Sequence, residues 1–81
     1  MNLEAINKKM NIKLIIEKAL IHDLKNNKKF YSYYLYVYSL DSDECIKDYL
    51  CDDLPQALYM AKEDYGLDES DFKEVADSDN N

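Results

Sequence analysis

The chain has 81 residues, of which 47% are hydrophobic, with eight tyrosines, two phenylalanines and a formal net charge of −7. This length supports one small domain and leaves little volume for a deep substrate cleft. The negative charge argues against direct binding to nucleic acid or to an anionic membrane, because both surfaces would repel most of the chain.

The charges are unevenly placed along the sequence. Residues 1–40 contain seven lysines and three acids, a net charge of +4, whereas residues 41–81 contain three lysines and fourteen acids, a net charge of −11. There is no arginine to offset the acids. An acidic half of this kind is attracted to basic surfaces, including the nucleic-acid grooves of other proteins.

The first element in chain order is predicted to be a helix from Ile12 to about Asn26. Its apolar side chains recur at spacings that form one broad face: Ile12, Ile15, Ile16, Ala19, Leu20 and Leu24. Asn11 suits the N-cap position, and the lysines that follow Asn27 suit the negative end of a helix dipole. Residues 1–10 precede it, either as a flexible leader or as an extension of the same helix.

Two antiparallel strands are predicted next. Phe30–Tyr38 contains six aromatic residues in nine, has no helical period, and is typical of a strand. Its two faces are predicted to alternate, with Tyr31, Tyr33, Leu35 and Val37 on one and Phe30, Ser32, Tyr34, Tyr36 and Tyr38 on the other. Asp41–Glu44 is the turn to a second strand, Cys45–Cys51, and so short a connection requires antiparallel pairing.

A second helix is predicted to begin after Asp53, which suits the N-cap position, with Gln56 completing a capping box and Pro55 in the first turn. Its apolar stripe comprises Leu54, Ala57, Leu58, Ala61 and Tyr65. Gly66 is expected to end the helix in the left-handed conformation, followed by a hydrophobic contact from Leu67. Phe72–Ala76 fits either a short third strand or a last helical turn.

These elements predict a small single α+β domain spanning residues 1–81, with a polar tail at residues 77–81. The expected order is helix, strand, strand, helix and strand, with both helices packed on one face of a short antiparallel sheet.

No residue pattern in the sequence indicates a catalytic, metal or cofactor site. His22 is the only histidine, and no nucleophile motif surrounds any serine. Two cysteines and one remote histidine do not supply the closely spaced ligands of zinc. Asp41–Ile46 begins like a calcium-binding loop, but Cys45 and Ile46 replace residues that such a loop needs. We therefore expect a protein that is not an enzyme.

The cysteines indicate the compartment. Cys45 and Cys51 would lie about 20 Å apart along one strand, too far for a disulfide. Because the sequence shows no signal peptide or membrane-length apolar run, two free thiols favour the reducing cytoplasm.

Tyrosines and acids form the candidate binding surface. Aromatic side chains on both faces of Phe30–Tyr38 exceed what a one-sided core requires, and tyrosine is enriched at binding hot spots. Acids on a small rigid domain can also imitate phosphates in a partner's basic groove. Two alternatives to a binding role remain. The tyrosines would then serve only to cover the sheet, and the acids only to keep the protein soluble. The residues predicted to bind a partner are Asp41, Asp43, Glu44, Asp48, Tyr34, Tyr36, Tyr38, Glu63 and Asp64.

One stretch of the sequence resembles a known group of proteins. Asp52–Leu67, followed by Asp71–Val75, is similar to small acidic bacterial immunity-type proteins that neutralise toxins, which show an acidic capped helix and an A-x-x-x-A-K-E-x-[FY]-G pattern. The size, acidity and tyrosine content also resemble those of phage anti-CRISPR inhibitors. Both resemblances imply a non-catalytic inhibitor that occludes a basic partner, and neither assigns functional residues.

The sequence thus favours an acidic inhibitor that blocks a protein with a basic surface, such as a nuclease or another nucleic-acid-binding protein. No direct contact with nucleic acid or membrane is expected. The alternative is a structural or regulatory subunit that uses its tyrosine face to form a homodimer or a larger complex.

Overall fold

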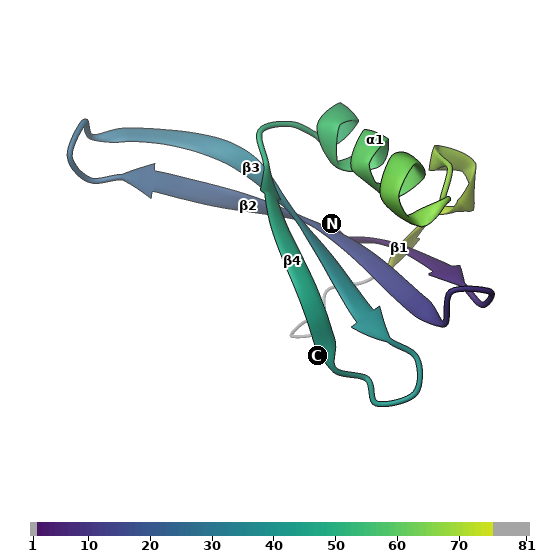
Figure 1. The fold of residues 1–81 in the computed structure, drawn as a ribbon. Coiled ribbons are helices and arrows are strands. Elements are labelled where there is room, and N and C mark those ends of the chain that lie inside the picture. Colours follow the sequence, from purple (N-terminus) through teal and green to yellow (C-terminus); the bar gives the residue numbers. More distant parts are fainter. Residues whose placement is uncertain (1, 76–81) are drawn as a thin grey trace.

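The computed structural model describes residues 2–75 as one antiparallel sheet with a single α-helix (Figure 1). The elements are β1 (Asn2–Asn7), β2 (Ile12–Asp23), β3 (Lys28–Ser39), β4 (Cys45–Cys51), α1 (Leu54–Tyr65), the 3₁₀ turn η1 (Glu69–Asp71) and β5 (Lys73–Val75). The strands are ordered β4-β3-β2-β1-β5. The fold is therefore mainly sheet, and the predicted order of helix, strand, strand, helix and strand is wrong.

The error lies in Ile12–Asn26, which was predicted to be a helix and instead forms β2 and the turn after it. Burial in β2 alternates with period two: Ile12, Leu14 and Ile16 are buried, while the residues between them are not. Asn11 has φ 59° and Asn27 has φ 51°, so both lie in left-handed turns and neither caps a helix. The β-branched isoleucines of this segment are residues that favour a strand.

Residues 2–7, where a flexible leader or a helical extension was expected, form β1. This strand pairs along its whole length with β2 and over three residues with β5. Its turn into β2 is stabilised by the Asn7 Oδ1, which accepts a hydrogen bond from the Met10 N–H at 3.1 Å. The N-terminal segment is therefore part of the sheet.

The aromatic strand and the strand after it are confirmed. β3 includes all of Phe30–Tyr38 and runs from Lys28 to Ser39, and β4 has the predicted bounds. The two pair antiparallel, with a register shift between Val37 and Tyr38. The predicted division of β3 into two faces also holds, because Leu35 and Val37 are buried under the helix.

The prediction of the second helix is confirmed at both ends. The Asp53 side chain accepts a hydrogen bond from the Gln56 N–H at 2.9 Å. The Gln56 side chain accepts one from the Asp52 N–H at 2.7 Å, one residue earlier than a capping box requires. Gly66 has φ 65° and is left-handed, and Leu67 after it is buried.

The last element is a strand, β5, which resolves the two alternatives left open by the sequence. Ala76 and the predicted polar tail at 77–81 lie outside the described residues.

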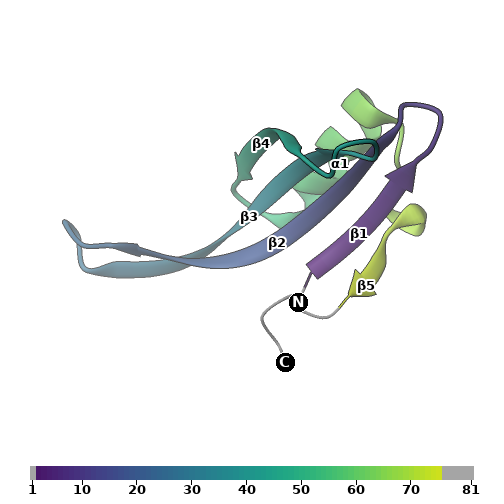
Figure 2. The ribbon, with the colours of Figure 1, turned by 90° about the horizontal axis from the view of Figure 1, so that it is seen from below.

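The core lies between α1 and one face of the sheet. Helix residues Ala57 and Ala61 are fully buried against strand residues Leu14, Leu35 and Val37. The predicted helix stripe is confirmed, since the rest of it packs against this cluster. Seen from below, α1 lies behind the sheet and no described element covers the face toward the viewer (Figure 2).

Candidate functional site

The sheet face opposite α1, which we call the open face, is the candidate binding surface. Cross-strand partners share a face in an antiparallel sheet, so the pairings of β1 to β4 define its members. In the body of the sheet they are Asn2, Glu4, Ile6, Lys13, Ile15, Glu17, Tyr34, Tyr36, Tyr38, Cys45, Asp48 and Leu50, and the same face continues along the β2–β3 hairpin with Ala19, Ile21, Asp23, Lys28, Phe30 and Ser32.

Three tyrosines form a row along β3 on this face. The rings of Tyr34 and Tyr36 are stacked, with centroids 5.7 Å apart, and those of Tyr36 and Tyr38 are tilted with centroids 6.3 Å apart. The Lys13 Nζ lies 5.5 Å from the centre of the Tyr38 ring. The row is therefore ordered by side-chain contacts that do not involve the core.

Acids surround the tyrosine row. Burial raises the pKa of Tyr36, and the nearby Glu17 carboxylate raises it further. Burial likewise raises the pKa of Tyr38, with smaller effects from Cys45 and Glu17. Asp48 lies directly opposite Tyr36 in the sheet. The open face therefore offers neutral phenol hydroxyls in a negative environment, which suits a cationic partner.

A shallow hollow of about 370 Å³ lies at the centre of the open face, and its walls include Glu4, Glu17, Tyr36 and Tyr38. The Asn2 Oδ1 on the same wall is buried and accepts no hydrogen bond from any described residue. The hollow thus presents three carboxylates and the Asn2 acceptor beside one lysine, Lys13, and two tyrosine hydroxyls. Because its carboxylates outnumber its one lysine, the hollow favours a cationic group.

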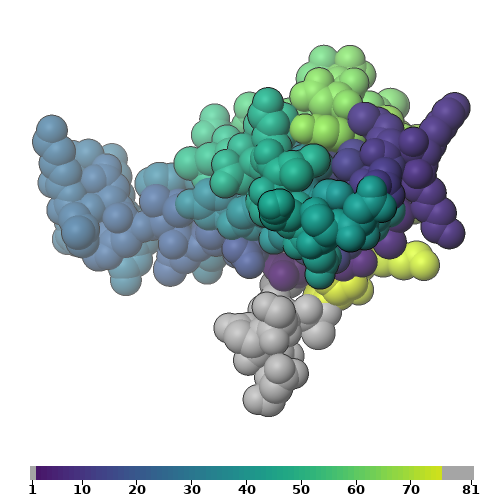
Figure 3. All heavy atoms as spheres, turned by 60° about the horizontal axis from the view of Figure 1, so that its bottom comes forward, coloured from purple at the N-terminus to yellow at the C-terminus, as the bar shows by residue number. Residues whose placement is uncertain are grey.

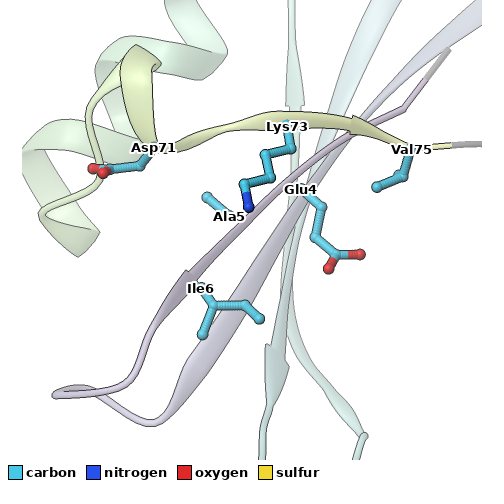
Figure 4. A pocket seen from close by; sticks show the side chains of 6 residues that line it. All are labelled: Glu4, Ala5, Ile6, Asp71, Lys73 and Val75. Carbon is cyan, nitrogen blue, oxygen red and sulfur yellow. The ribbon is translucent and has the colours of Figure 1, made fainter.

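A second hollow of about 290 Å³ lies at the β1–β5 edge (Figure 4). Glu4 and Lys73 extend from paired positions on its two strands, near Ile6 and Val75. Its polar groups have opposite charges on adjacent strands, which is an ordinary cross-strand arrangement. We assign no chemistry to it.

The structure brings five of the predicted binding residues together. Tyr34, Tyr36, Tyr38 and Asp48 are on the open face, and Asp43 lines the central hollow. The Asp43 carboxylate lies 3.8 Å from the Lys13 Nζ.

The remaining predicted residues lie elsewhere. Asp41 and Glu44 are exposed in the β3–β4 turn next to this face. Glu63 and Asp64 are exposed on α1, in the layer on the other side of the sheet. One flat surface does not reach both layers, so the two acidic clusters lie on different surfaces of the chain.

Reasoning from sequence missed the part of the open face formed by β1 and β2. Glu4, Lys13, Ile15 and Glu17 were assigned to a leader or a helix, and so were not considered as neighbours of the tyrosines. The signal that would have identified this segment as a strand is that the apolar Ile12, Leu14 and Ile16 alternate with Lys13, Ile15 and Glu17, as in a strand with one buried face.

Within residues 2–75, no group of three or more His, Cys, Asp or Glu side chains lies close enough to hold a metal ion. His22 is exposed near the end of β2. Cys45 is exposed, whereas Cys51 is buried and burial raises its pKa. The described part of the chain contains no helix with the length and apolar character needed to cross a membrane.

Comparison with family models, with curated proteins and with solved structures gives no match to this chain.

Proposed function

We propose that this protein is a non-catalytic inhibitor whose open face binds the basic surface of a nucleic-acid-acting protein. The observation that carries the proposal is the tyrosine row of β3, which lies outside the core and is bordered by acids. Tyrosines give large contact area at low entropic cost, and carboxylates attract lysines and arginines of a groove that binds phosphates.

The charge of the chain supports the same partner class. The β3–β4 turn adds three acids, Asp41, Asp43 and Glu44, at the end of the tyrosine row. Acids that project from the tip of a turn act on the approach of a partner, because long-range attraction increases the association rate. Tyrosine contacts buried on binding act mainly on the dissociation rate.

Kinetics with a captured partner test the proposal. Wild-type protein and a Tyr36→Ala variant serve as baits in extracts, with Tyr59→Ala as the control because Tyr59 is 64% exposed on α1. The binding partner is then studied by surface-binding kinetics at two salt concentrations. Tyr36→Ala should speed dissociation, and Tyr59→Ala should leave it unchanged.

The charge contribution is tested by matched triple variants. Neutralising Asp41, Asp43 and Glu44 should slow association and reduce its dependence on salt. The control neutralises three acids of the other layer: Glu63, Asp64 and Glu69. Association of the wild type that does not depend on salt would disprove charge mimicry, and a larger effect of the control would place the partner on α1.

A further inference from the structure

The long hairpin of β2 and β3 extends beyond the rest of the sheet. β1 begins opposite Glu17 and β4 ends opposite Tyr33, so no strand among the described residues flanks residues 18–32. We call this segment the arm, and Figure 3 shows it projecting from the body of the molecule. It contains four lysines and one aspartate, a net charge of +3, in a chain whose net charge is −7.

The tip of the arm is an ordered turn. The Asp23 Oδ1 accepts hydrogen bonds from the backbone N–H groups of Lys25 at 3.1 Å and of Asn26 at 3.3 Å. The hydrogen bonds from Asn26 lower the pKa of Asp23. Because the only carboxylate of the arm is engaged in this turn, the lysines determine what the arm attracts.

Both faces of the arm have exposed apolar side chains. The exposed Leu20 and Tyr31 form a cross-strand pair on the side of α1, and the exposed Phe30 forms one with the partly buried Ile21 on the open face. Tyr31 already has a partner, since the Lys18 Nζ lies 4.3 Å from the centre of its ring. Phe30 is 49% exposed and makes no aromatic or cation–π contact within residues 2–75. An aliphatic and aromatic pair of this kind favours a protein surface over nucleic acid.

We propose that the arm of each chain docks on the open face of a second copy, so that two chains form a two-fold dimer by exchanging arms. On its docking face the arm supplies Lys28, which lies opposite Asp23, and the unpartnered Phe30. The body supplies Glu4, Glu17 and Asp48, with the tyrosine row. The net charge of +3 on the arm thus attracts the acidic body of the second copy.

The order of residues along the hairpin fits this arrangement. Ala19 and Ser32 form a pair of small side chains between the arm and the body. Ser32 is already buried within the chain, so a second copy would pack on the side chains around this pair. A two-fold axis that crosses the strands at this pair places Ile21 and Phe30 of one chain over Glu17 and Tyr34 of the other. The same axis brings Lys28 close to the Glu17 carboxylate of the second copy.

The area of the open face fits a stable dimer. With ~3.3 Å per residue and ~4.8 Å between strands, β1 to β4 cover about 600 Å² in plan, and their side chains expose more than this. Specific interfaces bury ~800 Å² on each partner. The arm therefore converts an uncovered sheet into the inner layer of a two-sheet sandwich.

This inference uses the open face of the proposed function but needs no other protein. A target with a basic surface competes with the arm for the same tyrosines. The dimer is a property of the purified chain, whereas the proposed function is measured with a captured partner. Phe30 lies on the arm, outside the tyrosine row and the acids that the proposed function uses. A Phe30→Ala variant that loses the dimer and still binds that partner therefore separates the two.

The test measures the mass of the purified chain in solution by sedimentation equilibrium. We expect a dimer that dissociates more readily as salt rises from about 0.1 M to 1 M, where screening lengths fall from ~10 Å to ~3 Å. Phe30→Ala removes one central contact per arm and two per dimer, so the dissociation constant should rise by about a hundredfold. Tyr31→Ala, one residue away on the other face, should change it less than about twofold.

A second matched pair tests the charges. Lys28 is on the open face and Lys29 is on the opposite face of the arm. Lys28→Glu should weaken the dimer and Lys29→Glu should not, and adding Glu17→Lys to Lys28→Glu should restore it. Circular dichroism of each variant confirms that the exposed substitutions leave the fold intact.

Three results would overturn the proposal. One is a wild-type chain that stays monomeric at the highest soluble concentration. Another is a dimer that Phe30→Ala and Tyr31→Ala weaken equally, because the contact would then not be made by the open-face side of the arm in particular. The third is a monomer that binds a fluorescent DNA duplex through Lys28 and Lys29 alike, which would make the arm a nucleic-acid contact.

Discussion

Two adjacent isoleucines of β2 distinguish the strand from the helix that the sequence favoured. Ile16 is 2% exposed between its strand partners Leu3 and Leu35, whereas Ile15 is half-buried on the open face. Ile16→Ala removes buried methyl and methylene groups and leaves a cavity, which costs about 2–5 kcal/mol. Ile15→Ala removes the same atoms from a partly solvated surface, and by area it costs about 1 kcal/mol.

The difference is large relative to the stability of a domain of this size, which is expected to be about 4–12 kcal/mol. Urea unfolding followed by far-ultraviolet circular dichroism gives the free energy of unfolding of each variant. Leu14→Ala serves as the positive control, because Leu14 is fully buried on the same face as Ile16. A helix with Ile12, Ile15, Ile16 and Ala19 on one face requires similar losses at Ile15 and Ile16. Equal losses would therefore refute the strand.

Three further predictions concern single sites. Gly66→Ala should destabilise the chain by about 1–2 kcal/mol, because Gly66 has φ 65° and an added Cβ is strained in the left-handed region; urea unfolding measures the loss. Burial, together with the hydrogen bond between the Tyr65 and Tyr49 hydroxyls at 2.8 Å, raises the pKa of Tyr65 from 10.0 to about 12. Because the pKa of Tyr65 is higher in the folded state than in the unfolded state, the buried Tyr65 hydroxyl stabilises the fold fully below pH 10, and this stabilisation is lost as the pH rises through about 12. An ultraviolet titration in which every tyrosine ionises near pH 10 would contradict this prediction. A thiol reagent should label Cys45 rapidly and Cys51 only after unfolding, and rapid labelling of both would show that Cys51 is not buried.

The sequence was sufficient for the elements whose signals are local. Asp53 and Gly66 bracket α1 because an N-cap side chain and a left-handed residue act on the backbone within one turn of their own position. β3 was recognised because its run of aromatic residues has no helical period. As a result, the tyrosines and the acids of the β3–β4 turn were named correctly as neighbours, although their role in binding stays a prediction.

β1 and β2 were not predictable in this way. The apolar positions of Ile12–Leu24 satisfy a helical period, yet Ile12, Leu14 and Ile16 also satisfy a period of two. The Asn residues before and after the segment suit helix ends as well as tight turns.

Only tertiary structure decided between these two patterns. As a strand, β2 hydrogen-bonds to β1 on one side and to β3 on the other, and it buries Leu14 and Ile16 under α1. Many of these pairings join residues that are far apart in the sequence. A pattern read over a short stretch of sequence therefore does not include the stability that they provide. The open face exists for the same reason: a central strand turns every second side chain away from the core, and Ile15 and Glu17 join the tyrosines there.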